Sequence, residues 1–171
     1  MRAFQAGYAL RMATNCLTIH VPPDVVFAVL ADGRSYEHWL VGCKRIRGVD
    51  EGWPKPGTRI HHRVGAGPFT LDDTTKVVES ERPARLVLEA RARPIGVARV
   101  DFTLEAEGEQ DCLITMQEHP VRGPAKSLHN PLFEAMISAR NQKSLKQLRD
   151  YAESSAVSAA GRPQPATGDP G

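Results

Sequence analysis

The strongest constraint on the fold of this chain is a long alternation of polar and apolar residues between Gly42 and Glu118. Side chains of a β-strand point alternately to the two faces of a sheet, so a period of two residues predicts strands. Turn-rich segments divide this stretch into six strands, which we expect at 43–49, 57–65, 69–80, 84–92, 97–107 and 111–118. Short connections between successive strands imply an antiparallel meander.

Two neighbouring predicted strands indicate that one face of the sheet is polar and the other apolar. Leu86, Leu88 and Phe102 fall on the apolar face, whereas Glu89 and Arg99 fall on the polar face. Arginines and acids gather along this polar region, among them Arg82, Arg85, Arg91, Arg93, Arg99, Asp101 and Glu105. We interpret them as cross-strand ion pairs rather than as a track for phosphates.

The segments on either side of the alternation predict the remaining elements. Cys16–His20 alternates like a short strand, Pro23 marks the start of a helix, and 34–40 forms another helical turn. Asn130 and Pro131 begin a long C-terminal helix whose apolar residues recur at spacings of three and four. The predicted fold is therefore α+β, with a curved seven-stranded antiparallel sheet, two short helices and a long C-terminal helix across the concave face.

The two ends of the chain differ from the region between them. We expect 1–15 to be an N-terminal extension, with either Met1 or Met12 as the start, and 154–171 to be a disordered tail. The region 16–153 holds 19 basic and 19 acidic residues, and this neutral balance weighs against binding to nucleic acid. No apolar run is long enough to cross a membrane, and the three scattered cysteines are typical of a reducing, cytoplasmic compartment.

Four segments of the chain resemble the START-like (SRPBCC) superfamily, whose members share the helix-grip fold. These segments are HVPPDVVFAVLADGRSYEHW (20–39), KPGTRIHHRVGAGP (55–68), ERPARLVLEARARP (81–94) and NPLFEAMISARNQKSLKQLRDYAE (130–153). The resemblance is strongest to small bacterial proteins of the polyketide cyclase/dehydrase and lipid-transport type. It implies a START-like ligand-binding domain over 16–153. Because this superfamily includes binders, transporters and enzymes, the fold does not by itself give the activity.

His62 and Asp73 are the sharpest candidates for chemistry. The GAGP turn makes 57–65 and 69–80 neighbours, and strand parity then places both side chains on the inner face, directly or diagonally opposed. A carboxylate that orients an imidazole in an apolar pocket provides a general base or a polar anchor for a ligand. The alternatives are a buried pair that satisfies only itself and a register that turns both side chains into solvent.

Strand parity and the helix stripe place further residues around a pocket. Arg140 either reaches into it toward a ligand oxygen or snorkels to solvent, and Trp39 lies at the rim. Glu118 and His119 end the last strand near the mouth, where they act on a ligand or are only solvated. The expected ligand-binding residues are Trp39, Ile60, His62, Phe69, Leu71, Asp73, Phe102, Met116, Met136 and Arg140.

We expect neither a metal nor another cofactor. His61 and His62 are adjacent in a strand and point to opposite faces, so they do not chelate one ion. The sequence also has no Walker-type loop and no GxGxxG after a strand.

Three functions fit these observations. The first is the binding of a hydrophobic or aromatic small molecule, such as a lipid or polyketide, in a cavity between the sheet and the C-terminal helix. Such a binding protein could also transport its ligand. The second is a polyketide aromatase/cyclase or dehydratase in which His62, held by Asp73, abstracts a proton and Arg140 stabilises the enolate. The third is an interaction module that assists chaperones. A monomer and a homodimer are both compatible with the sequence.

Overall fold

The computed structural model describes residues 13–66, 69–92, 96–124 and 131–160. Within them, seven strands form an antiparallel sheet in the order β1-β7-β6-β5-β4-β3-β2. The elements in chain order are β1 (Ala13–Ile19), α1 (Pro23–Ala31), α2 (Tyr36–Trp39), β2 (Cys43–Val49), β3 (Arg59–Ala66), β4 (Phe69–Glu81), β5 (Arg85–Ala92), β6 (Gly96–Ala106), β7 (Cys112–Arg122) and α3 (Pro131–Ala160). This architecture confirms the predicted α+β fold.

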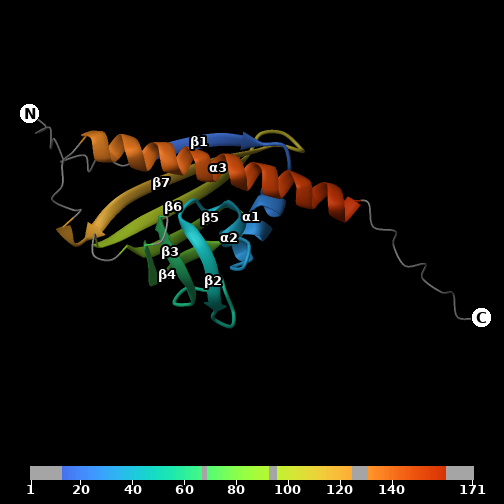
Figure 1. Cartoon of the computed structure of the whole chain (residues 1–171). Coiled ribbons are helices and arrows are strands. Elements are labelled where there is room, and N and C mark those ends of the chain that lie inside the picture. Colours follow the sequence, from blue (N-terminus) through green and yellow to red (C-terminus); the bar gives the residue numbers. More distant parts are fainter. Residues whose placement is uncertain (1–12, 67–68, 93–95, 125–130, 161–171) are drawn as a thin grey trace, which may run out of the picture.

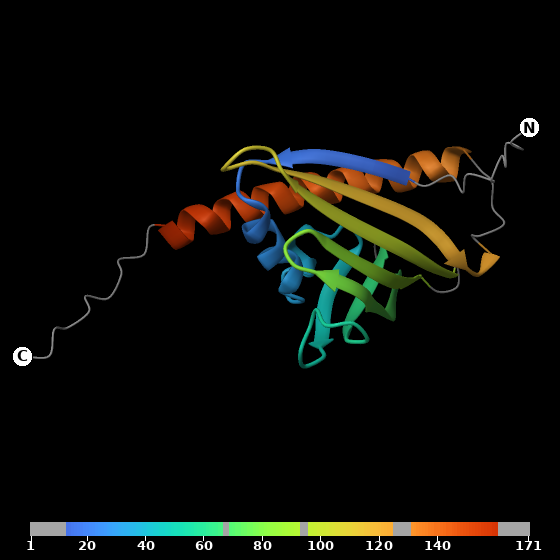
Figure 2. The same cartoon turned by 180° about the vertical axis from the view of Figure 1, so that it is seen from behind.

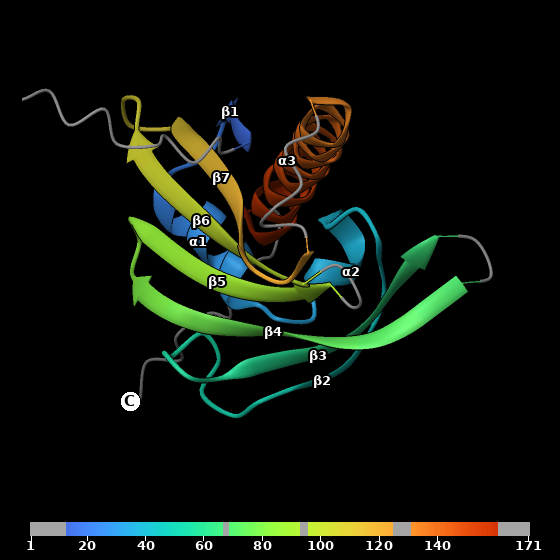
Figure 3. The same ribbon diagram turned by 90° about the vertical axis from the view of Figure 1, so that its left-hand side faces the viewer.

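The sheet is strongly curved, and the helices lie on its concave side. Figure 1 shows α3 running along β1 and β7, with α1 and α2 close to its C-terminal half. In the view from behind in Figure 2, β1, β7 and β6 lie side by side with α3 on their far side. Seen end-on in Figure 3, the strands from β1 to β2 curve around the helices. The concave face of the sheet and α3 therefore face each other.

The structure extends the predicted elements at both ends of the domain. β1 begins at Ala13, inside the expected N-terminal extension. Residues 154–160, which we expected to belong to a disordered tail, form the last turns of α3. Alanine favours the helix there, and the hydroxyl of Ser155 donates back to the carbonyl of Tyr151 at 2.7 Å. Residues 1–12, including Met1 and Met12, and residues 161–171 lie outside the described part of the chain.

Two short helices close one end of the concave face. Pro23 occupies the first turn of α1, where the missing N–H is tolerated, and the apolar side of α1 is buried as predicted. The hydroxyl of Ser35 accepts a hydrogen bond from Nε1 of Trp39 at 3.0 Å and donates to the carbonyl of Val29 at 2.8 Å. This chain of bonds fixes α2 against α1. The hydroxyl of Tyr36 donates to the carbonyl of Leu30, and burial raises the pKa of Tyr36 well above its usual range.

α3 is packed against the core in its middle, between Asn141 and Ala152, and has no buried residue in its first ten positions. Its buried residues are Asn141, Ser144, Leu145, Leu148 and Ala152. Toward β1, the amide of Asn15 donates to Ser138 Oγ at 3.1 Å and to Gln142 Oε1 at 3.2 Å. No helix in the described ranges, α3 included, is both long and apolar enough to cross a membrane.

Candidate functional site

The β3–β4 hairpin carries a buried histidine and a buried aspartate on its inner face. His62 pairs directly with Asp73, and the two residues are 4% and 1% exposed. Ile60 and Thr75 pair in the same way at the next inner position and are also buried. Because the pairing of β3 with β4 has no bulge, parity is kept along the hairpin. The prediction that His62 and Asp73 are neighbours on the inner face is confirmed.

The imidazole of His62 bonds to a hydroxyl. Its Nε2 lies 2.9 Å from Oγ1 of Thr75, and its buried Nδ1 has no hydrogen-bond partner within the described residues. Oδ1 of Asp73 accepts the backbone N–H of Thr74 at 2.9 Å. Burial lowers the pKa of His62, while the charge of Asp73 opposes this shift and that of His61 adds to it. Burial thus favours the neutral ring, and one ring nitrogen is left that can bond to a ligand.

A second group of polar side chains links the inner face of β7 to α3. Glu118, which pairs with Val100 across the sheet, forms an ion pair with Nη2 of Arg140. The same guanidinium donates to Oδ1 of Asn141, from Nη2 at 2.8 Å and from Nε at 3.2 Å. Asn141 is fully buried, and its Nδ2 has no partner in the part of the chain that the structure describes. Asn141 therefore offers an unused donor on the inner side of α3.

Glu118 and Arg140 lie differently from the prediction. β7 continues to Arg122, so Glu118 is inside the strand and not at its end. Its side chain is only 10% exposed, because α3 covers it. Arg140 is neither directed freely into the interior nor extended into solvent, since its guanidinium reaches Glu118 on the strand. Sequence spacing could not reveal this pair, because it depends on the position of α3 along the sheet.

Four of the predicted ligand-binding residues form a fully packed end of the concave face. Trp39, Ile60, Phe102 and Met116 are all almost completely buried. The indole of Trp39 packs edge-on against Phe102, with ring centroids 6.2 Å apart. The expected place of Trp39 at a rim is therefore wrong. α2 packs close to α3 and carries the indole into the core.

Three other predicted residues are exposed, two at the start of β4 and one in the N-terminal half of α3. Phe69, Leu71 and Met136 are 83%, 51% and 58% exposed. Phe69 and Leu71 keep the inner-face parity, since they pair with the last residues of β3. They are exposed because the β3–β4 tip extends away from the neighbouring strands (Figure 3). Met136, together with the exposed Leu132, projects from the N-terminal half of α3.

Small residues occupy the inner face between the packed end and the exposed start of β4. Ala90 of β5 pairs with Thr75 on one side and with Ala98 of β6 on the other. Both alanines are only partly buried. A methyl group extends little from the sheet, so this row takes up less of the space toward α3 than a row of large side chains would. This row of small residues lies next to the His62–Asp73 pair, which is the next inner-face pair toward the end of β3.

The polar groups of the inner face that are named above are all able to form hydrogen bonds. Within the described ranges, no three His, Cys, Asp or Glu side chains are grouped so that they could hold a metal ion. What the face presents is a neutral imidazole, a buried carboxamide and one ion pair. These groups can donate or accept hydrogen bonds, and His62 can also accept a proton.

Comparison with protein families identifies the chain. Residues 13–153 match the model of a family described as "Polyketide cyclase / dehydrase and lipid transport". The chain belongs to this family. The matched range contains the whole sheet and every inner-face residue named above. No curated protein matches the chain.

Solved structures share the fold of this family member. The Zhui aromatase/cyclase from Streptomyces sp. R1128 is 18% identical with a TM-score of 0.69, and the match covers 88% of this chain and 98% of that one. A START superfamily protein from Mycobacterium smegmatis is 12% identical with a TM-score of 0.68, covering 84% and 97% of the two chains. Such low identities establish the fold alone. They confirm the predicted START-like, helix-grip architecture, and the family supports binding of hydrophobic small molecules in general terms.

Proposed function

We propose that the protein binds an apolar or aromatic small molecule with at least one polar oxygen, between the concave face of the sheet and α3. The proposal rests on two buried nitrogen atoms without partners among the described residues, Nδ1 of His62 and Nδ2 of Asn141. An unsatisfied buried polar atom costs about 1–3 kcal/mol, and native proteins keep few of them. A hydroxyl or carbonyl oxygen of a ligand would satisfy these atoms.

Exposed apolar side chains of the hairpin and of α3 would supply the apolar part of the proposed site. Phe69 and Leu71 on the hairpin and Leu132 and Met136 on α3 are large apolar side chains in contact with water. Covering apolar surface is worth about 25 cal/mol per Å². An apolar ligand that enters between the hairpin and α3 would cover part of this surface while its polar oxygen reaches His62 or Asn141. We place this activity in the cytoplasm, where the free thiols of the chain are stable.

A blocking substitution on the inner face tests the proposal. The probe is N-phenyl-1-naphthylamine, an uncharged dye whose fluorescence rises in apolar surroundings. Ala98→Phe fills the space that the small inner-face residues leave toward α3 and is expected to weaken dye binding at least tenfold. Thr103→Phe, on the outer face of the same strand, is the matched control and is expected to leave binding unchanged. Equal dye binding by both variants, or none by the wild type, would contradict the proposal. The second outcome would favour the chaperone-assisting module.

A second experiment tests the polar anchor. Naphthalene and 2-naphthol differ by one hydroxyl, so the ratio of their affinities reports the hydrogen bond to the protein. We expect the wild type to prefer 2-naphthol by about tenfold, the worth of one buried hydrogen bond. His62→Leu should reduce this preference without weakening naphthalene. An unchanged preference would show that His62 does not touch the ligand. Native mass spectrometry of protein from its own host would then identify the natural ligand.

The neutral state of His62 favours a second function, that of a polyketide cyclase or dehydratase. A buried imidazole with a lowered pKa can take a proton from the carbon beside a ketone, which leaves an enolate that attacks a second carbonyl. Asp73 would stabilise the imidazolium that results. Arg140 is bound to Glu118, so it would stabilise the enolate only after leaving that carboxylate. Turnover of a poly-β-keto thioester that is lost in His62→Gln, with ligand binding retained, is the test.

A further inference from the structure

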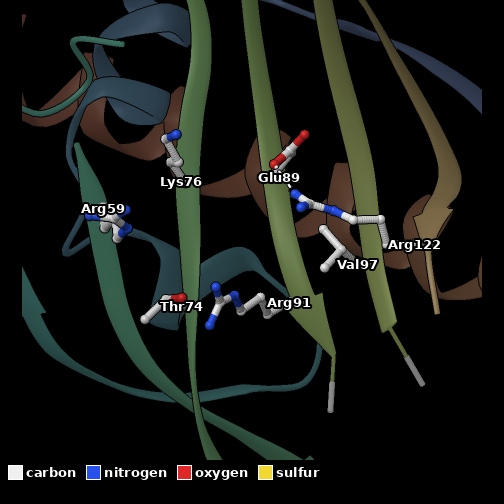
Figure 4. A pocket seen from close by; sticks show the side chains of 7 residues that line it. All are labelled: Arg59, Thr74, Lys76, Glu89, Arg91, Val97 and Arg122. Carbon is white, nitrogen blue, oxygen red and sulfur yellow. Dashed lines mark hydrogen bonds and ion pairs between the residues drawn. The ribbon is translucent and has the colours of Figure 1, made fainter. Parts of the chain in front are cut away.

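The outer face of the sheet carries a hollow that is lined mainly by cations. Its volume is about 240 Å³, and its charged lining consists of Arg59, Lys76, Arg91, Arg122 and Glu89. These residues come from β3, β4, β5 and β7 (Figure 4). Arg59, Lys76, Glu89 and Arg91 alternate along their strands with inner-face residues and therefore point away from α3. Arg122 reaches the same face because a register shift between Val97 and Ala98 places it opposite Val97. This hollow and the proposed ligand site lie on opposite faces of the same sheet.

Strand register explains why the cations meet. Arg59 pairs with Lys76, and Lys76 in turn pairs with Glu89. One step along, Arg91 pairs with Val97, which pairs with Arg122. In Figure 4 the guanidinium of Arg91 extends toward Thr74, whose hydroxyl adds a neutral donor to the lining. Cations from several strands thus converge on one place through backbone pairing alone.

The acid in the lining does not neutralise the cluster. Glu89 is already bound by two arginines, Arg99 at 3.1 Å and Arg122 at 3.0 Å. Arg59, Lys76 and Arg91 form no side-chain ion pair with any carboxylate among the described residues. Our prediction of cross-strand ion pairs on this face therefore holds for Arg85 and Arg99 and is wrong for Arg91. Three cations held close together without counterions favour the binding of an anion.

The cluster is confined on both sides by paired charges. Toward the hairpin tip, Asp72 binds Arg63 at 2.9 Å and Arg47 at 3.2 Å. Toward the other end of β4, Arg85 binds Glu79 at 2.7 Å and Asp101 at 2.6 Å. A nucleic acid needs a continuous track of unpaired cations that follows successive phosphates, and the carboxylates of these groups interrupt such a track. The geometry fits a compact anion.

We propose that this hollow is a binding site for a phosphate or diphosphate group of a small molecule. Guanidinium groups match phosphate oxygens with paired hydrogen bonds, and a lysine adds a point charge. A carboxylate has one charge and two oxygens, so it would satisfy one arginine and leave the other cations unpaired. A phosphate group carries up to two charges and at least three oxygens, which several cations from different strands can share.

Titration of the full chain with inorganic pyrophosphate, followed by calorimetry at 50 mM salt, tests the site. Lys76→Gln combined with Arg91→Gln is expected to weaken binding about tenfold or more. Lys143→Gln combined with Lys146→Gln removes the same charge from exposed positions on α3, and it should change the affinity less than twofold. Amide signals of Thr74, Lys76, Arg91 and Val97 should shift on binding. Equal affinities of the two double variants, or no saturable binding by the wild type, would overturn the proposal.

Two further arms distinguish the source of the phosphate group. Binding of glycerol 3-phosphate without binding of vesicles assigns the site to soluble phosphorylated molecules. Binding of phosphatidylcholine vesicles that contain phosphatidic acid, lost in the Lys76/Arg91 variant, assigns it to a lipid headgroup. Binding of neither overturns the proposal. Ala98→Phe should leave pyrophosphate affinity unchanged, so the result is independent of the inner-face site.

Discussion

Removing one partner of the Glu118–Arg140 ion pair is expected to destabilise the connection between the sheet and α3. In Arg140→Met, the carboxylate of Glu118 stays only 10% exposed and loses its counterion, while Asn141 loses its guanidinium donor. Breaking a buried pair costs about 3–5 kcal/mol, and an exposed pair is worth about 1 kcal/mol or less. Because Arg140 is 36% exposed, we expect a loss of about 2 kcal/mol in the free energy of unfolding. For a domain of this size, Tm would fall by roughly 4–8 °C.

A double-mutant cycle separates the ion pair from the loss of each side chain. Urea unfolding at pH 7, followed by circular dichroism, would be measured for Arg140→Met, Glu118→Gln and the double variant. The double variant should be about 1–2 kcal/mol more stable than the sum of the two single losses predicts. Arg149→Met is the control on the same helix, because its partner Asp150 is largely exposed and the loss should stay below about 0.5 kcal/mol. Additive losses for Arg140 and Glu118 would refute the reasoning.

Three more substitutions probe the core and the titration of the inner face. Phe102→Ala removes a buried ring that packs on Trp39, and it should cost about 3–5 kcal/mol in urea unfolding; a loss below 1 kcal/mol would mean that this end is not tightly packed. The pKa of His62 is lower in the folded chain than in the unfolded chain, so below about pH 6.5 the unfolded chain binds more protons. The free energy of unfolding therefore decreases as the pH is lowered, by up to about 1.4 kcal/mol per pH unit. His62→Gln should flatten the dependence of stability on pH between 7.5 and 5, and parallel curves would contradict this. Gly33→Ala places a methyl group 2.8 Å from Val49 and is expected to cost about 1–3 kcal/mol, measured by thermal unfolding against wild type.

The sequence was sufficient to predict the fold and the central pair of the site. The alternation of residues defined the strands, and the position of the GAGP turn put His62 opposite Asp73, as the pairing shows. Parity also placed Ile60, Phe102 and Met116 on the buried face. These predictions succeeded because they depend on local periodicity and on the shortest connection in the sheet.

The exposure of several predicted ligand-binding residues, and the ion pair between β7 and α3, depend on how far each strand or helix extends beyond its neighbours. Parity gives the direction of Phe69 and Leu71 but not the presence of a neighbour above them, so their exposure was not predictable. The exposure of Met136 was not predictable either, because the apolar stripe of a helix does not show how much of the helix the sheet covers. The contact between Arg140 and Glu118 needs the position of α3 along the sheet. That position is set by distant bonds, such as those from Asn15 to α3.

Alternation along β4 also explains why one hairpin can carry two separate sites. Asp73 and Thr75 point inward, whereas Thr74 and Lys76 point to the outer face. A slip of one residue against β3 would turn both sets to the wrong face, so the unbroken pairing of the hairpin holds both proposed sites in place. Because no ligand touches both faces of a sheet, a substitution such as Lys76→Gln should leave the inner face intact. Loss of one activity with retention of the other would then identify the face on which each ligand binds.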